Sequence, residues 1–250
     1  MALLHVGQVS VRFGGVQALQ SVDVDVAAGE VTGLIGPNGA GKTTLFDVVC
    51  GLQPTGHGRV LLDGTDITRL KAHARARLGV ARTFQRLELF DSMSVRDNIR
   101  VAAEVHRSYS RRRGAAPEVD AGTPGARADA VLDRVGLRAV ADERADSLPT
   151  GLARLVEVGR ALAGQPKVLL LDEPSSGLGA TETDRFAALL HDLATDGLGI
   201  LLVEHDVDLV MRVCARVHVL DFGRVIAAGP PADVQRDSAV QAAYLGAAVA

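Results

Sequence analysis

Hydrophobic positions in the first third of the chain alternate with polar ones. LLHVGQVSVRF (3–13) and VDVDVAAGEVTGLIG (22–36) carry apolar, often β-branched residues at every second position, which predicts two strands. The second strand leads into a glycine-rich turn, GPNGAGKTT (36–44), that opens a helix. Another short strand with its turn follows in GRVLLDGTDITRL (58–70), and LGVARTFQ (78–85) is a brief apolar run.

Apolar residues from about 87 to 163 recur at spacings of three and four, which predicts an inserted helical subdomain. SVRDNIRVAAEV (94–105), ARADAVLDRVGL (126–137) and the segment after Gly151 carry this pattern. Between the first two helices, RSYSRRRGAAPEVDAGTPG is rich in Arg, Gly, Pro and small residues. We expect a mobile, exposed loop at about 107–127. The arginine run 111–113 fits a solvated loop better than a contact with lipid head groups.

From residue 167 onward, apolar strands alternate with amphipathic helices. VLLL (168–171) and ILLV (200–203) are nearly continuous apolar runs, as expected for parallel strands covered on both faces. The chain shows no internal repeat. Its 250 residues, 47% of them hydrophobic, suit one α/β domain with an insertion.

Composition excludes several classes of function. A net charge of −3 and a pI of about 6.2 give no electrostatic footprint for nucleic acid. Cys50 and Cys214 form no metal or redox motif, and we expect buried free thiols in a reducing cytosol. The first residues lack the pattern of a signal peptide, and no apolar run is long enough to span a membrane. We therefore expect any membrane role to act through a partner.

The turn at residues 36–44 matches the phosphate-binding pattern G-x-x-x-x-G-K-[ST]. Its position between a strand and a helix is the context that this motif requires. Backbone amides of the turn and the helix N-terminus would surround phosphate oxygens. Lys42 would bind the β- and γ-phosphates, Thr43 would ligate Mg²⁺, and Thr44 would reach the α-phosphate. The candidate ATP-binding residues here are Gly36, Asn38, Gly39, Ala40, Gly41, Lys42, Thr43 and Thr44.

An acidic pair follows the second buried strand, VLLLDEP (168–174). Asp172 stands at the carboxyl end of the strand, where a carboxylate can hold a Mg²⁺ ion. Glu173 follows it and is positioned to polarise an attacking water. Such pairs are common after strands. The 130 residues from Lys42 to Asp172, with a helical insertion between them, favour a functional interpretation.

These motifs, in this order, resemble the ATP-binding-cassette (ABC) ATPases over essentially the whole chain. The resemblance implies a P-loop NTPase core of ABC type, with an N-terminal antiparallel β subdomain and an inserted α-helical subdomain. It implies that Phe13 stacks on adenine, with Val16 beside it. Gln85 in RTFQ matches the Q-loop glutamine, which reaches the metal and water. His205 after ILLVE matches the switch histidine that contacts the γ-phosphate.

The subgroup with the greatest resemblance is the ATPase of branched-chain amino acid importers, carried by RFGGVQAL, ARTFQRLELFDSMSVRDNI and the C-terminal GRVIAAGPPADVQRDSAVQAAYLG. The resemblance implies permease subunits as partners, a second and non-identical ATPase in a head-to-tail dimer, and indirectly an extracytoplasmic solute-binding protein. It places the protein peripherally on the cytoplasmic face of a bacterial inner membrane. Lipopolysaccharide-export ATPases share parts of the pattern, so export and a non-transport regulatory ATPase stay open as alternatives.

Two segments depart from the family pattern. The signature Leu-Ser-Gly-Gly-Gln reads LPTGL here (148–152), which keeps only Leu148 and Gly151, and Gly179 stands where the family has Asp or Asn. Thr150 supplies a hydroxyl one position late, and Gly151 keeps the close backbone approach. Both remain candidate contacts to the partner's nucleotide. We expect a weakened but usable signature, and a pair of unequal ATP sites. The intact motifs argue against a non-hydrolysing pseudo-subunit.

Overall fold

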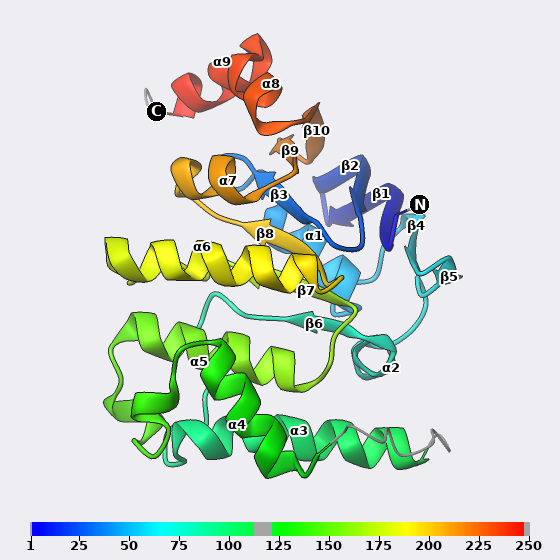
Figure 1. Cartoon of the computed structure of the whole chain (residues 1–250). Coiled ribbons are helices and arrows are strands. Elements are labelled where there is room, and N and C mark those ends of the chain that lie inside the picture. The colour runs from blue at the N-terminus through cyan, green and yellow to red at the C-terminus, as the bar shows by residue number, and fades with distance from the viewer. Residues whose placement is uncertain (1, 113–121, 248–250) are drawn as a thin grey trace.

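The protein is described by a computed structural model that covers residues 2–112 and 122–247. The first sheet, near the N-terminus, is antiparallel (Figure 1). Alternating burial of the valines in its long strands matches the period-two pattern of the sequence. Its strand order is β2-β1-β4-β5, with β1 (Leu4–Phe13), β2 (Val16–Val26), β4 (His57–Leu62) and β5 (Thr65–Asp66).

The second sheet has the order β10-β9-β3-β8-β7-β6, and its central strands are parallel. Because the carboxyl ends of parallel strands meet at one edge, the segments after β3, β7 and β8 converge there, which is where open α/β sheets bind ligands. The bounds are β3 (Val31–Ile35), β6 (Val80–Arg82), β7 (Val168–Asp172), β8 (Gly199–Val203), β9 (Arg216–Asp221) and β10 (Arg224–Gly229).

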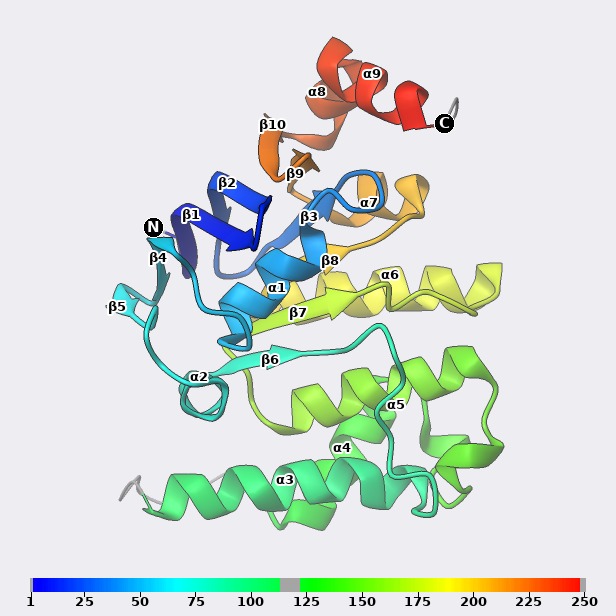
Figure 2. The ribbon, with the colours of Figure 1, turned by 180° about the vertical axis from the view of Figure 1, so that it is seen from behind.

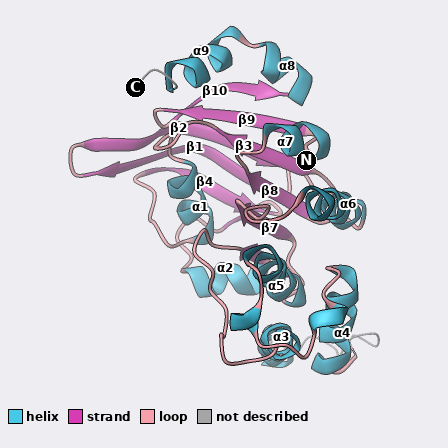
Figure 3. Ribbon diagram, turned by 90° about the vertical axis from the view of Figure 1, so that its left-hand side faces the viewer, coloured by secondary structure: helices cyan, strands magenta, loops and turns pink. Residues whose placement is uncertain are grey.

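Helices pack around the sheets, and two groups of them lie at opposite ends of the molecule. Helices α3–α5 gather at one end of the molecule, and α8 and α9 lie at the other, a division visible from both sides and in profile (Figures 2 and 3). The bounds are α1 (Lys42–Cys50), α2 (Ala72–Leu78), α3 (Val95–Arg112), α4 (Pro124–Arg134), α5 (Thr150–Ala163), α6 (Ala180–Thr195), α7 (Val207–Val213), α8 (Pro231–Arg236) and α9 (Ser238–Ala247).

Two apolar cores share the second sheet. Val168 and Leu170 of β7 face the core that contains α1 and the antiparallel sheet. Leu169 and Leu171 face the core formed with the inserted helices and α6. Because neighbouring residues of a strand point to opposite faces, a strand covered on both sides must be apolar throughout. This explains the unbroken VLLL run, and it fixes the residue that follows it, Asp172, at the edge of the sheet.

The predicted α/β class with an N-terminal antiparallel sheet is confirmed, with two corrections to the elements. The segment 22–36 is two strands, because Gly29 turns the chain at φ 76° and moves it from one sheet to the other. The loop expected at 107–127 is shorter at both ends, because residues 107–112 extend α3 to Arg112 and residues 124–127 begin α4. The rest of that loop lies largely in 113–121, outside the described residues. Within the part described, none of the helices has the length and hydropathy that crossing a membrane requires.

Candidate functional site

The glycine-rich turn between β3 and α1 forms a tight cradle. Gly39 and Gly41 adopt φ values of 79° and 108°, which side-chain-bearing residues rarely tolerate. A Cβ atom at Gly36 would lie 2.0 Å from the Leu220 carbonyl oxygen, and one at Gly41 would lie 2.8 Å from the Ala18 carbonyl oxygen. The sequence therefore needs glycine at these positions to bring its backbone amides around an anion. The residues present fit a nucleotide phosphate chain.

Lys42 begins α1 and points back into this turn. Its ammonium donates to the carbonyl oxygens of Gly36 and Pro37, the second at 3.0 Å. Burial lowers the pKa of Lys42, and the carboxylates of Glu173 and Asp172 partly oppose that effect. A buried cation beside two carboxylates and a helix N-terminus is a suitable partner for a polyphosphate.

Asp172 is held by two residues that sequence reasoning missed. Its carboxylate accepts from the Arg82 guanidinium at 3.1 Å, and its backbone N–H donates to the Thr83 hydroxyl at 3.1 Å. Arg82 also pairs with Asp47 of α1. Burial raises the pKa of Asp172, an effect that Arg82 partly offsets. The RT of the RTFQ segment was the available signal, but the pairing joins residues 90 positions apart.

Three predicted catalytic residues meet at one carboxylate. Glu173 Oε1 accepts from Gln85 Nε2 at 3.2 Å and lies 2.9 Å from His205 Nε2. Glu173 has a left-handed backbone, φ 50°, and its N–H donates to the Val203 carbonyl at 2.9 Å. The ends of β6, β7 and β8 thus bring Gln85, Glu173 and His205 together.

These groups line one cavity of about 480 Å³. Of the predicted site residues, Phe13, Gly36, Thr150 and Gly151 are not among its lining. Phe13 is half exposed at the end of β1. The lining includes one aromatic residue that the sequence did not single out, Phe222. The predicted residues that do line the cavity are Val16, Asn38, Gly39, Ala40, Gly41, Lys42, Thr43, Thr44, Gln85, Asp172, Glu173 and His205.

Comparison with known families decides the identity of this fold. The family described as "ABC transporter" matches residues 19–176, which include the phosphate-binding turn, the acidic pair and the inserted helices. This chain belongs to the ABC transporter ATP-binding family. A second family, described as "Branched-chain amino acid ATP-binding cassette transporter", matches residues 224–250 of this ABC cassette.

Curated relatives and solved structures cover nearly the whole cassette. The lipopolysaccharide export ATP-binding protein LptB of Escherichia coli K12 is 34% identical over 98% of each chain. The branched-chain amino acid transport ATP-binding proteins LivG of Escherichia coli K12 and BraF of Pseudomonas aeruginosa are 37% and 38% identical, also over 98% of each chain. A nucleotide-free ABC cassette superposes with a TM-score of 0.85 at 28% identity, covering 98% of this chain and 99% of that one. The ADP conformation of the cassette MJ1267 gives 0.83 at 28%, with the same coverage.

The altered signature lies at the N-terminus of α5, away from the cavity of the same chain. Pro149 precedes the helix and supplies no capping side chain, while Thr150 is exposed and Gly151 is buried. A Cβ atom at Gly151 would lie 2.7 Å from the Gly177 carbonyl oxygen. Leu152 packs against the core. The two positions open to a partner are therefore Pro149 and Thr150.

Side chains of α5 bind the backbone of the Q-loop, the segment around Gln85 that follows β6. Arg154 donates to the carbonyl oxygens of Phe84, at 2.6 Å, and of Gln85. Glu157 accepts from the Glu88 N–H at 2.9 Å and pairs with Arg154 at 3.1 Å. These side chains are buried, so α5 and the segment around Gln85 are joined by a buried hydrogen-bonded network.

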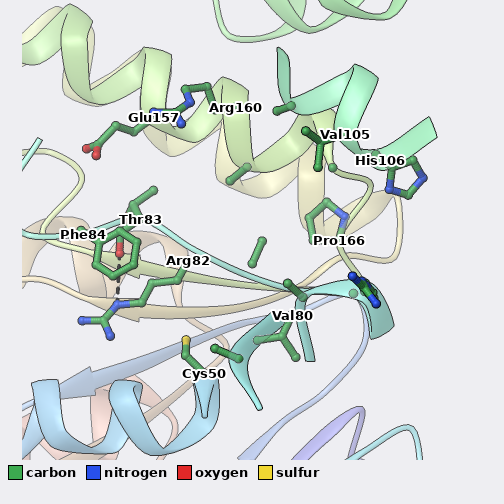
Figure 4. A pocket seen from close by; sticks show the side chains of 18 of the residues that line it. Cys50, Val80, Arg82, Thr83, Phe84, Val105, His106, Glu157, Arg160 and Pro166 are labelled. Carbon is green, nitrogen blue, oxygen red and sulfur yellow. Dashed lines mark hydrogen bonds between the residues drawn. The ribbon is translucent and has the colours of Figure 1, made fainter. Parts of the chain in front are cut away.

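A second cavity, of about 560 Å³, opens beside the Q-loop on the other side of β6 (Figure 4). Its wall is mainly apolar and draws on β6, α2, α3 and α5. Phe84 and Val105 line it and are 40% and 47% exposed. The Arg82 guanidinium lies over the Phe84 ring at 4.9 Å. Arg82 and Thr83 thus contact Asp172 and also line this second cavity.

Proposed function

We propose that this ABC cassette hydrolyses ATP in order to power import of branched-chain amino acids, or of a related small polar solute, through a membrane permease. The observation that carries the catalytic part is the meeting of Gln85, Glu173 and His205 in the cavity of Lys42. The importer subgroup is supported by the match of residues 224–250 to a branched-chain amino acid transporter family. It is also supported by LivG and BraF, at 37% and 38% identity.

Each site residue has a defined part in this proposal. The amides of residues 38–43 and the Lys42 ammonium bind the phosphates of ATP. Thr43 and Asp172 hold Mg²⁺, with Gln85 reaching the same ion, and Mg²⁺ when bound neutralises charge on the phosphate oxygens. Glu173 orients the attacking water and accepts its proton, while His205 donates to the γ-phosphate.

The permease docks in the second cavity, the one beside the Q-loop. Phe84 and Val105 offer exposed apolar surface there, and surface of this kind commonly marks an interaction site. The apolar residues that follow Gln85, which are Leu87, Leu89 and Phe90, are further candidates for this contact. Leu89 packs against the core, whereas Phe90 is 42% exposed. The exposed positions for a photo-crosslinking residue are therefore Phe84, Phe90 and Val105.

A reconstituted transport assay tests the importer function. The cassette, assembled with its permease and partner ATPase in liposomes, is expected to take up radiolabelled leucine when ATP and a leucine-loaded binding protein are present. Glu173→Gln in the same assembly should abolish uptake. Lipopolysaccharide export is the second candidate, favoured by LptB at 34% identity. ATPase activity stimulated by lipopolysaccharide, and not by the loaded binding protein, would replace import by export.

A further inference from the structure

Phe222 stands at the turn between β9 and β10 and lines the cavity of Lys42. Its side chain is 83% exposed. Its backbone is left-handed, with φ 41°, a conformation that a bulky side chain strains to adopt. Single exposed apolar residues are common and need no explanation. A strained aromatic residue held open on the wall of a ligand cavity is a different case.

The turn that carries Phe222 is fixed to the phosphate-binding loop. The Gly223 N–H donates to the Ala40 carbonyl at 2.9 Å. On the other side, the Gln20 N–H donates to the Gly223 carbonyl at 2.7 Å, and Arg224 donates to Gln20 Oε1 at 2.6 Å and 2.9 Å. These contacts tie the turn to both β2 and the loop, so the backbone of Phe222 has a fixed place relative to the phosphate-binding loop.

The cavity wall has a charged part and an apolar part. Lys42, Asp172 and Glu173 form the charged part, which suits phosphates and metal. Val16, Ala18 and Phe222 come from β2 and the adjoining turn. The turn that carries Phe222 lies against β2, since a Cβ atom at Gly223 would lie 2.5 Å from the Ala18 carbonyl oxygen. The base and sugar of a nucleotide need such an apolar surface.

We propose that Phe222 packs against the base of the bound nucleotide and supplies the aromatic face of this site. The inference rests on the proposed ATP-binding function and goes beyond it. It adds an aromatic contact to the one expected from Phe13, whose side chain is not part of the cavity lining. Stacking of an aromatic ring on a base depends on the π-face that every base has.

Titration calorimetry of the full chain with Mg²⁺-ATP and with Mg²⁺-tripolyphosphate tests this inference. Tripolyphosphate has the phosphates of ATP and no base. Phe222→Asn removes the ring and keeps a residue that tolerates positive φ. It should weaken ATP binding by about tenfold and leave tripolyphosphate binding unchanged. Phe222→Tyr should bind ATP like the parent. Phe222→Gly, which relieves the backbone strain, should show the same loss as Phe222→Asn.

Two controls separate this inference from the proposed function. Lys42→Ala should lose affinity for both ligands, and parent-like binding by that variant would refute the ATP site itself. Leu70→Ala, at an exposed apolar residue outside the cavity, should bind as the parent does. If Lys42→Ala loses both ligands while Phe222→Asn binds ATP like the parent, the role of Phe222 is refuted. Equal weakening of ATP and tripolyphosphate by Phe222→Asn would also refute it, because the phosphate loop would then be the cause.

Discussion

Glu173 concentrates the chemistry of the site on one carboxylate. Its backbone is held in the left-handed region at φ 50°, at a cost of about 1 kcal/mol. The N–H bond to Val203 fixes that conformation, and Gln85 and His205 contact the same oxygen atom. In the proposed role, a side chain aimed in this way would orient a water molecule without further rearrangement.

Arg82→Ala tests the anchor of the neighbouring Asp172 carboxylate. The side chains of Arg82 and Asp172 are 6% and 5% exposed. Removing the cation leaves a buried carboxylate unpaired, which should lower the free energy of unfolding by about 3 kcal/mol. Urea unfolding measures this change. Arg134→Ala breaks the exposed pair with Asp196 and should cost less than about 1 kcal/mol. Equal losses for the two variants would contradict the anchoring role of Arg82.

The N-terminus of α5, which carries the altered signature, depends on a close contact that only glycine permits. Gly151→Ala would bring its Cβ atom to 2.7 Å from the Gly177 carbonyl oxygen and 2.8 Å from Leu178 Cδ2. We expect a loss of about 1–3 kcal/mol in thermal or urea unfolding. Gly125→Ala in α4 meets no atom closer than 3.8 Å and should stabilise the chain by about 0.5 kcal/mol. Parent-like stability of Gly151→Ala would show that α5 shifts freely.

Local motifs were predictable from the sequence, and contacts between distant segments were not. The phosphate-binding turn consists of consecutive residues, and so does the acidic pair, so the sequence alone predicts the chemistry of each. Arg82 and Thr83 reach Asp172 across about 90 residues, and the RT of the RTFQ segment does not by itself indicate which distant carboxylate it contacts. The composition of 107–125 as a whole predicts a loop, but the first glycine of this segment, Gly114, comes only after the residues that extend α3.

The burial of His218 makes the free energy of unfolding of the whole molecule sensitive to acid. His218 of β9 is 5% exposed, and burial lowers its pKa from 6.5 to about 4. Well above pH 6.5 the His218 side chain is neutral in both the folded and the unfolded chain. Between pH 6.5 and 4 the unfolded chain binds a proton that the folded chain excludes, so stability falls by up to about 1.4 kcal/mol per pH unit.

Replacing the histidine checks this linkage. His218→Leu should flatten the decline in free energy of unfolding between pH 6.5 and 4, measured by urea titration at a series of pH values. A parent-like slope in His218→Leu would assign the acid sensitivity to other groups.

In an assembly with a second ATPase, the effect of the altered signature on the rate of ATP hydrolysis can be measured. We expect this chain's signature to complete the partner's site, so the test uses Glu173→Gln to silence the site on this chain. Adding Pro149→Ser and Thr150→Gly, both at exposed positions, should raise the remaining turnover about tenfold by restoring a hydroxyl donor. Leu152 is left unchanged because it packs against the core. Unchanged turnover would mean that the altered signature is simply tolerated.

One paired measurement tests the proposed role of Glu173 in hydrolysis. ATP binding by calorimetry and phosphate release are measured on the parent and on Glu173→Gln from matched preparations. The amide keeps the shape of the carboxylate but cannot accept a proton. We predict ATP affinity within about threefold of the parent and hydrolysis at least about 100-fold slower. Glu143→Gln, at an exposed glutamate, should hydrolyse like the parent. Hydrolysis by Glu173→Gln at the rate of the parent would refute a catalytic role for this carboxylate.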